Sequence, residues 1–189
     1  DSLGLFSAPR VWWTLRAMGF PKVVVLDGGL PKWQADGHAL TDGPGAPVPT
    51  AVTPDFRPEL VRDLDAVRAT LNQGDAQIVD ARPAARFRGE APEPRAGLRG
   101  GHMPGAANLP WDSVLNPDGT MRTPDELRRA FAQSGVDLSR PIVTTCGSGV
   151  SAALLALALA RLGREDVAVY DGSWTEWAGR ADTPVVTGA

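Results

Sequence analysis

The stretch from 141 to 170 constrains the fold most, because its pattern runs strand, glycine loop, apolar helix and strand. The β-branched run at 142–145 predicts a short buried strand, and 167–170 predicts another. The apolar pattern between them, which ends near Leu162, predicts a helix. Two strands joined through a helix pair in parallel, and helices then cover both faces of the sheet. We therefore predict an α/β fold with a central, mostly parallel sheet flanked by helices on both faces.

The same alternation of strands and helices extends upstream. A helix pattern at 64–71 is followed by a strand pattern at 77–79, and 105–109 predicts a further strand. The sequence Thr-Pro-Asp-Glu at 123–126 is a capping box with proline at the first helical position, so we expect a helix to about Gln133. These elements supply the neighbours that a parallel sheet needs.

Residues 1–40 repeat part of this pattern. A helix is predicted to begin after Ser7, and 23–26 predicts a buried strand that ends in a glycine turn. The segment 14–29 matches 158–173 at a constant offset, since 171 − 27 = 144 and 163 − 19 = 144. We therefore expect 1–40 to be the carboxy-terminal remnant of a first domain that is homologous to the second.

The region between the two domains has a different composition. Residues 41–55 are rich in proline and glycine, which resist both helix and sheet, so we predict a linker there. The second, more complete domain is expected at 56–189. The helix and strand of 1–40 lack neighbours of their own, so this remnant is expected to dock, to stay loose or to drive self-association.

Composition argues against several classes of function. A net charge of −3 gives no reason to expect nucleic acid or an anionic membrane as a partner. The longest apolar run, 150–160, is too short to span a bilayer, and no signal-peptide pattern is visible. One cysteine and two histidines are poor material for a metal site. We expect a cytoplasmic protein with no metal and no cofactor.

Cys146, the only cysteine, lies between the strand 142–145 and a Gly-Ser-Gly turn at 147–149. An isolated cysteine is most often inert packing. A glycine loop, however, can turn several backbone N–H groups toward one point, and the start of a following helix adds partial positive charge. This setting favours a thiolate, so the loop is a candidate for nucleophilic chemistry.

Three chemistries use a strand, a glycine loop and a helix start. A dinucleotide site would use Gly-x-Gly-x-x-Ala at 147–152 with Asp171, but only one strand–helix–strand unit follows the loop. Phosphate-ester hydrolysis needs an arginine at the far end of the loop, where 151–153 is Ser-Ala-Ala. Sulfur transfer needs a loop that stabilises a thiolate and a persulfide, and the arginine-rich loop 82–99 can hold an anionic donor.

Motifs outside the loop make the sulfur-transfer interpretation specific. They are Asp-Ala-Arg at 80–82, Arg-Phe-Arg-Gly at 86–89, Pro-Glu-Pro-Arg at 92–95, Gly-His-Met-Pro-Gly-Ala-x-Asn at 101–108 and Tyr-Asp-Gly-Ser-Trp-x-Glu-Trp at 170–177. With Cys-Gly-Ser-Gly-Val-Ser at 146–151, the chain from about Phe56 to its end resembles the carboxy-terminal domain of two-domain rhodanese-family sulfurtransferases. Residues 1–40 resemble the end of that family's inactive first domain.

The resemblance implies a reaction and its reactants. Cys146 would take a sulfur atom from a small anionic donor and pass it from a persulfide to an acceptor thiol, such as thioredoxin, or to cyanide. The Cys-Gly-Ser-Gly loop resembles the 3-mercaptopyruvate branch, whereas the thiosulfate branch typically carries arginine and lysine after the cysteine. Thiosulfate is therefore the second choice of donor.

The resemblance also assigns roles to single residues. Cys146 and Ser148 are implied to be catalytic, with the Ser148 hydroxyl in proton transfer, and Arg86 and Arg95 are implied to hold the donor's carboxylate and keto oxygen. The implied amide cradle and substrate site also contains Gly147, Gly149, Val150 and Ser151. Ser148 would act with a histidine and an aspartate of the missing first-domain half. His38 and His102 do not match that histidine, so impaired activity is expected, and His102 is expected to be structural.

Several residues have structural interpretations. We expect Arg82 to brace its loop through Asp80, and Arg88 and Arg99 to be solvated. The tryptophans are expected to fill cores or interfaces; they are Trp12, Trp13, Trp174 and Trp177. The alternative function is a non-catalytic module that keeps the fold and uses the loop as an anion or partner site.

Overall fold

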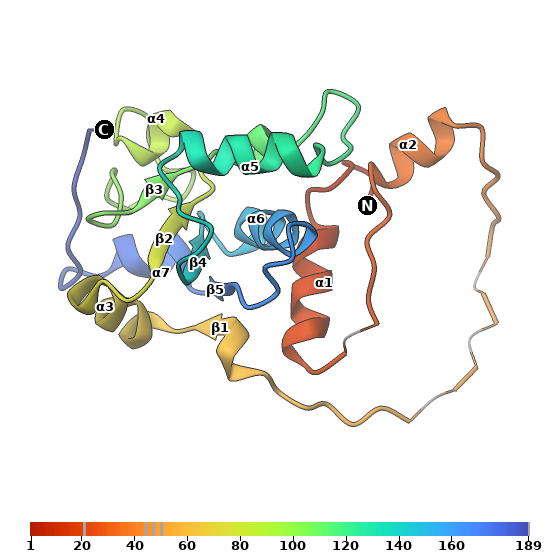
Figure 1. The fold of residues 1–189 in the computed structure, drawn as a ribbon, viewed down its shortest axis with the longest axis horizontal. Coiled ribbons are helices and arrows are strands. Elements are labelled where there is room, and N and C mark those ends of the chain that lie inside the picture. The colour runs from red at the N-terminus through yellow and green to blue at the C-terminus, as the bar shows by residue number, and fades with distance from the viewer. Residues whose placement is uncertain (21, 44, 47, 50, 189) are drawn as a thin grey trace.

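A computed structural model describes residues 1–188 of the chain except 21, 44, 47 and 50. Its centre is a five-stranded sheet whose neighbouring strands are all parallel. In spatial order the strands are β1 (Val61–Arg62), β5 (Ala168–Tyr170), β4 (Ile142–Thr145), β2 (Gln77–Asp80) and β3 (Ala107–Asn108) (Figure 1). Strand β4 is central, with Thr144 in register with Val79 on one side and Val169 on the other. The predicted α/β fold with a parallel sheet is confirmed.

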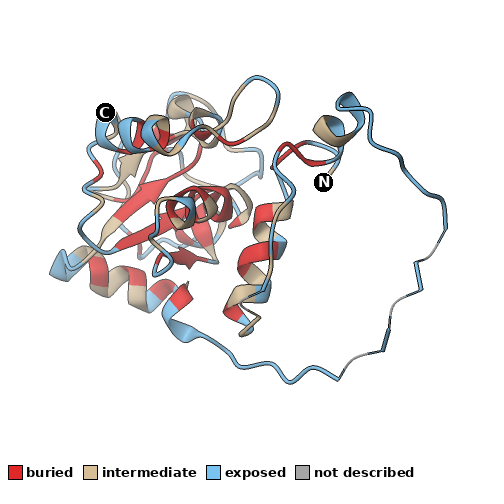
Figure 2. Ribbon diagram, turned by 45° about the vertical axis from the view of Figure 1, so that its right-hand side comes forward, coloured by how far each residue is buried: buried red, intermediate tan, exposed pale blue. Residues whose placement is uncertain are grey.

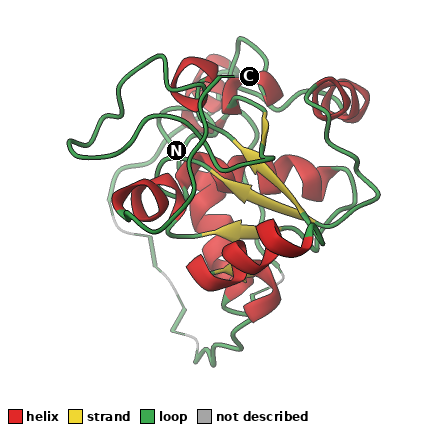
Figure 3. Ribbon diagram, turned by 90° about the vertical axis from the view of Figure 1, so that its left-hand side faces the viewer, coloured by secondary structure: helices red, strands yellow, loops and turns green. Residues whose placement is uncertain are grey.

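Helices cover both faces of this sheet (Figure 3). They are α1 (Ala8–Ala17), α2 (Gly29–Ala35), α3 (Leu64–Gln73), α4 (Ala84–Phe87), α5 (Pro124–Gln133), α6 (Val150–Arg161) and α7 (Ser173–Gly179), with short 3-10 segments η1 (Pro58–Leu60) and η2 (Trp111–Val114). Helix α5 has the predicted capping box between Thr123 and Glu126. Elements β1, α4 and α7, which are two, four and seven residues long, were not predicted from the sequence.

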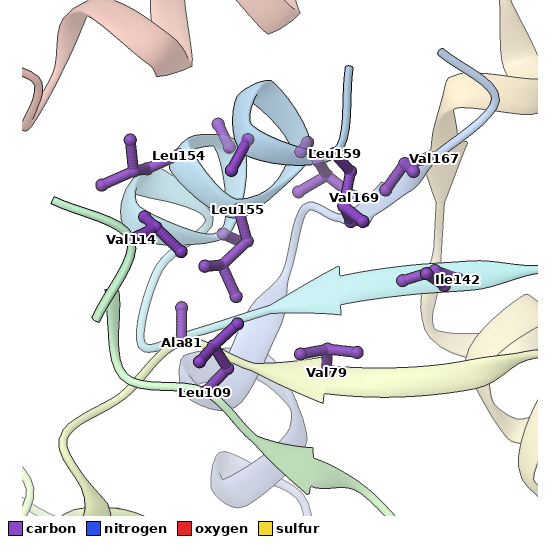
Figure 4. Packing of buried hydrophobic residues seen from close by; sticks show 14 of the residues in the cluster. Val79, Ala81, Leu109, Val114, Ile142, Leu154, Leu155, Leu159, Val167 and Val169 are labelled. Carbon is purple, nitrogen blue, oxygen red and sulfur yellow. The ribbon is translucent and has the colours of Figure 1, made fainter. Parts of the chain in front are cut away.

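Alternate residues of each strand enter two separate cores. On one face, Val79, Ile142 and Val169 pack with α5 and α6, as Figure 4 shows for α6. On the other face, Val143 and Tyr170 pack with α3 and α7. Successive side chains of a strand point to opposite faces, and burial on both faces is what a parallel sheet requires. Strand β4 is therefore buried along its whole length, and its carboxyl end is held rigidly.

Helix α1 docks on α6, on the side away from the sheet (Figure 1). Trp12 and Trp13 are buried there, as expected, and the Trp13 indole donates a hydrogen bond of 3.1 Å to the carbonyl of Leu60. Figure 2 shows α6 buried almost all round, because the sheet covers one side of it and α1 the other. Of the three expected fates of the 1–40 segment, the structure has the docked one.

The predicted buried strand at 23–26 is wrong. These residues form extended coil with no strand partner among the described residues, and Val24 is 91% exposed. The alternation of the pattern survives, because Val23 and Val25 pack partly against the core while Val24 faces away from it. A strand is stabilised by hydrogen bonds to its neighbours, and no described neighbour lies beside this one.

The internal repeat is visible in the helices. Helix α2 occupies 29–35 and α7 occupies 173–179, so both ends differ by 144 residues. Helix α1 ends at Ala17 and α6 at Arg161, again 144 residues apart. The described residues from 38 to 57 are coil (Figure 1). The linker and the division into two domains stay predictions.

None of the helices in the described part of the chain is both long and apolar enough to cross a membrane.

Candidate active site

Cys146 follows the carboxyl end of the central strand β4, and its side chain is 2% exposed. The backbone N–H of Gly149 donates to its Sγ at 3.1 Å, and that of Ser148 at 3.4 Å. Gly149 has φ 78°, the left-handed conformation that glycine adopts without strain, and it caps α6. A Cβ at this position would lie 2.5 Å from Arg10 Nη1. Glycine at 149 therefore lets the loop close around the sulfur without backbone strain and leaves room for the Arg10 guanidinium.

This geometry favours negative charge on the sulfur. Two amide dipoles point at Sγ, and the amino-terminal end of the twelve-residue helix α6 follows directly. Amides and a helix start both stabilise a thiolate relative to a thiol. The same donors stabilise a persulfide anion, whose outer sulfur extends from Sγ.

Cys146 opens into a cavity of about 420 Å³. Its wall consists of Phe6, Arg82, Pro83, Arg86, Glu93, Pro94, Arg95, Leu98, Trp111, Cys146, Gly147, Ser148, Val150, Ser151 and Thr175. The structure thus brings together both predicted arginines and the predicted loop residues. Gly149 is the exception in the loop, because it lies behind the sulfur and contributes its N–H rather than cavity wall.

A buried carboxylate orients one arginine of the cavity. Glu93 accepts from Arg86 Nη2 at 2.5 Å and from Arg82 Nη1 at 2.9 Å. Arg82 is fully buried, and its guanidinium also binds Asp80 at 2.6 Å and stacks over Trp174 at 4.1 Å. The predicted brace between Arg82 and Asp80 is confirmed, and Trp174 is core rather than cavity wall. Glu93 went unpredicted, since nothing in a sequence marks a carboxylate that faces inward.

The two predicted donor-binding arginines differ in their surroundings. Arg86 is paired with Glu93 and lies over the loop, 3.1 Å from where a Cβ on Gly147 would be. Arg95 is exposed, and its Nη1 donates to Thr175 Oγ1 at 2.5 Å. Among the ion pairs of the described residues, none involves Arg95. Of the three arginines in the cavity wall, Arg82 and Arg86 are therefore paired with carboxylates and Arg95 is not, a balance that attracts an anion.

The start of α7 holds the cysteine loop from the outside. The carbonyl of Cys146 accepts from Trp174 N at 2.9 Å, and that of Gly147 accepts from Thr175 N at 3.0 Å and from its hydroxyl at 2.6 Å. The Ser173 hydroxyl accepts from Cys146 N at 3.4 Å. Ser173 has φ 50°, a conformation rare outside glycine. Sequence reasoning missed Thr175 and Ser173, although both lie inside a quoted motif.

Helix α7 is anchored in turn by a phenol. Tyr170 donates to Glu176 at 2.7 Å, and burial together with this hydrogen bond holds the pKa of Tyr170 well above its ordinary value of 10. The phenol therefore remains a neutral donor over the whole physiological range.

Residues near the start of the chain also reach the site. Phe6 lines the cavity and meets the Trp111 ring edge-on at 5.7 Å. Arg10 pairs with Asp171 at 2.6 Å and donates to the carbonyl of Gly149 at 3.3 Å. No local pattern could identify Arg10, because its partners lie more than 130 residues away.

The remaining predictions concern Arg88, Arg99 and the two histidines. Arg99 is not solvated as predicted: its guanidinium donates to carbonyls at the end of α7 and in the following turn, those of Trp177, Ala178, Arg180 and Thr183. Arg88 is solvated, in an exposed pair with Glu90. His102 is structural, stacked on Phe87 at 3.7 Å, and neither histidine lines the cavity. Among the described residues, no group of three or more His, Cys, Asp or Glu could hold a metal ion.

Comparisons with known proteins identify the family of the chain. A sequence profile of the rhodanese-like domain matches residues 63–180. The chain is 48% identical over 185 residues to the 3-mercaptopyruvate sulfurtransferase of Escherichia coli (strain K12), covering 98% of this chain and 66% of that protein. It is 43% identical over 178 residues to the Homo sapiens 3-mercaptopyruvate sulfurtransferase, covering 94% and 60%. Rattus norvegicus thiosulfate sulfurtransferase is also 43% identical, over 182 residues, 96% and 61% of the two chains.

Solved structures are similar as well. SseA from Escherichia coli, a 3-mercaptopyruvate sulfotransferase, matches 90% of this chain and 64% of its own with a TM-score of 0.79 and 45% identity. The Tum1 protein from Saccharomyces cerevisiae matches 99% and 67% with a TM-score of 0.86 and 31% identity. The chain spans 54% to 66% of the full length of curated relatives that it matches. With its parallel sheet, its cysteine loop and these matches, the chain belongs to the rhodanese-like domain family.

Proposed function

We propose that this chain is the sulfur-carrying part of a sulfurtransferase that moves sulfur from 3-mercaptopyruvate to a thiol or to cyanide. One observation carries the proposal: Sγ of Cys146 receives two loop amides at the base of a cavity whose wall includes Arg86 and Arg95. Thiosulfate is the second candidate donor. The names of relatives include both substrates, and the enzyme class follows from them together with the site.

The first step loads the cysteine. The Cys146 thiolate attacks the sulfur of mercaptopyruvate, the S–S bond forms, and the C–S bond breaks. The electron pair of the broken bond goes to the carbon, which takes a proton and leaves as pyruvate. Arg86 and Arg95 hold the carboxylate and the keto oxygen, and the loop amides stabilise the persulfide. The exposed Ser148 hydroxyl at the cavity wall is proposed to relay the proton.

The second step unloads it. A thiolate acceptor such as thioredoxin, or cyanide, attacks the outer sulfur of the persulfide. The S–S bond breaks, its electron pair returns to Cys146, and the acceptor leaves with the sulfur. The first step ends and the second begins with the persulfide form of the enzyme, so the kinetics are expected to be ping-pong.

The neutral loop favours mercaptopyruvate over thiosulfate. Cys146 is followed by Gly147 and Ser148, and the positive charge of the cavity comes from arginines of another loop. Two separated cations suit a donor with a carboxylate and a neighbouring keto oxygen. The preference is expected to appear as a higher loading rate with mercaptopyruvate.

We further propose that 1–40 is the end of a first domain, 41–55 a linker and 56–189 the catalytic domain, in a cytoplasmic protein. The repeat at an offset of 144, in sequence and in helix ends, supports the homology of the two domains. The rest of that first domain is proposed to complete the cavity and to supply the proton-transfer partners of Ser148. This chain is therefore expected to turn over slowly even when its cysteine loads.

Intact-mass spectrometry tests the proposal. After treatment with mercaptopyruvate and removal of the donor, the protein is expected to gain one sulfur atom, mapped to Cys146 by peptide analysis. Cys146→Ala is the control and is expected to gain none. An unchanged mass, or equal gain by the control, would exclude sulfur transfer and leave a non-catalytic anion-binding module as the function.

A further inference from the structure

Arg10 contacts the sulfur-binding loop from a helix that precedes the linker. Its Nη1 is 2.6 Å from Asp171 Oδ1 and 3.3 Å from the carbonyl oxygen of Gly149, and its guanidinium lies over the Trp13 ring at 4.6 Å. The side chain is only 28% exposed. Arg10 does not line the cavity, so its role is separate from donor binding.

The carbonyls of the loop bind donors outside it, and this sets where the N–H groups point. A trans peptide is planar, so its C=O and the following N–H point in opposite directions. The Gly147 carbonyl is held outward by Thr175, and the N–H of the same peptide, that of Ser148, points inward at Sγ. The Gly147–Ser148 peptide therefore has its carbonyl outside the loop and its N–H inside it.

Arg10 binds the carbonyl of another peptide of the loop, the one between Gly149 and Val150. Gly149 is the N-cap of α6, so its carbonyl begins the hydrogen-bond ladder of the helix and also accepts from Arg10. The N–H of Val150 therefore faces the opposite way, toward the cavity that Val150 lines. As the first residue of α6, Val150 has an N–H without an intrahelical partner. Sγ already receives the N–H groups of Ser148 and Gly149, which leaves the Val150 N–H for the outer sulfur of a persulfide.

We propose that Arg10 is a positioning residue for sulfur loading: it fixes the Gly149–Val150 peptide so that its N–H meets the transferred sulfur atom. The inference rests on the proposed sulfur transfer. It also gives the segment before the linker a direct role at the cysteine loop, beyond covering α6.

Arg16 offers a matched control on the same helix. It pairs with Glu165 at 3.0 Å and lies over Trp12 at 4.9 Å, so it makes the same two kinds of contact as Arg10. Its partners are remote from the cysteine loop. Arg10→Gln and Arg16→Gln should therefore lower the melting temperature similarly, and only the first should affect the sulfur chemistry.

The experiment measures single-turnover persulfide formation in the 189-residue chain against mercaptopyruvate concentration, by rapid-quench mass spectrometry. Arg10→Gln is expected to lower the maximum loading rate about tenfold, less than the roughly hundredfold loss on removing an oxyanion donor itself. The half-saturating concentration should stay within about twofold, since Arg10 does not touch the donor. Arg16→Gln should match the wild type in both. Wild-type loading by Arg10→Gln, or an equal loss in Arg16→Gln, would overturn the proposal.

Two further measurements keep the result interpretable. If Arg10→Gln does not fold, Arg10→Lys decides: lysine keeps the charge, but its ammonium cannot reproduce the planar fork of a guanidinium, so slower loading is expected and wild-type loading would contradict us. Iodoacetamide alkylation of Cys146 separates the two levels of the account. If the wild type forms no persulfide, the sulfurtransferase proposal fails, while slower alkylation in Arg10→Gln than in Arg16→Gln still supports positioning of the loop, and equal alkylation rejects it.

Discussion

Two segments 144 residues apart share one sequence pattern and differ in structure. At 167–179 a strand enters the sheet between β1 and β4, turns, and is followed by α7. At 23–35 the same pattern gives extended coil, a turn with Gly28 at φ 77° where Gly172 has φ −61°, and α2. The helices keep matching ends, whereas only one of the two strands forms.

The difference shows what each kind of element needs. A helix makes its backbone hydrogen bonds within the segment, so α2 forms without a neighbouring strand, and residues 1–4 pack against its start. A strand depends on neighbours, and the described residues offer none to 23–26. Burial follows the same division, since Trp177 is fully buried and its counterpart Trp33 only partly.

The largest contrast is expected at the two tryptophans. Trp177→Ala removes a fully buried ring and should lower the free energy of unfolding by about 3–5 kcal/mol. Trp33→Ala removes a ring that packs against His38 at the surface, and should cost under about 1 kcal/mol. Urea unfolding measures both, and equal losses would mean that the two segments are equally integrated in the fold.

A matched pair of isosteric substitutions tests the strands themselves. Val169→Thr places a hydroxyl in a fully buried position of β5 and should cost about 1–3 kcal/mol. Val25→Thr, at the corresponding position 144 residues earlier, leaves the hydroxyl able to reach water and should cost about 0.5 kcal/mol or less. A large cost at Val25 would indicate that 23–26 is buried in solution, against the coil described here.

The turn of the first segment gives a smaller effect. Gly29 has φ 59°, and a Cβ there would collide with the carbonyl oxygen of Gly4 and lie 2.6 Å from that of Asp1. Gly37 has φ 78° with open space around it, so Gly37→Ala reports the backbone cost alone, about 1 kcal/mol. Gly29→Ala is expected to lose roughly 1 kcal/mol more than this control, from displacement of the first residues. Thermal unfolding of the two variants measures the difference, and identical values would show that residues 1–4 do not pack on α2.

The smallest effect concerns an exposed carboxylate after α7. Hydrogen bonds from Arg180 and Arg68 hold the pKa of Asp182 well below its ordinary range. A lowered folded-state pKa stabilises the protein above the unfolded-state value of about 3.9, and this contribution is lost as the pH falls through the folded-state pKa. Asp182→Asn should therefore shift the urea midpoint slightly downward at pH 7, and the shift should shrink as the pH is lowered below about 4. A shift independent of pH would point to a packing role for this side chain.

Local signals carried most of what the sequence could predict. The capping box before α5, the strand before Cys146 and the glycine turn each depend on neighbouring residues, and each is present in the structure. The strand at 23–26 failed because its stability depends on residues far along the chain. Arg99 failed for a related reason, because the carbonyls that it binds lie about 80 residues away.

The candidate site also divides into residues that a local motif predicts and residues whose contacts form only in the folded chain. The motif match identified Arg86, Arg95 and the loop around Cys146, and all contribute to one cavity or its amides. Glu93, which orients Arg86, and Arg10, which contacts Gly149, act through contacts that only the folded chain makes. Their roles follow from side-chain geometry that no spacing in the sequence encodes.

A single labelling experiment tests the central claim, that sulfur passes through Cys146. The chain is loaded with mercaptopyruvate that carries isotopically labelled sulfur, freed of donor, and treated with cyanide. The account predicts one labelled thiocyanate for each loaded Cys146 and a return of the protein to its unmodified mass. Label that stays on the protein, or thiocyanate formed equally by Cys146→Ala, would contradict it.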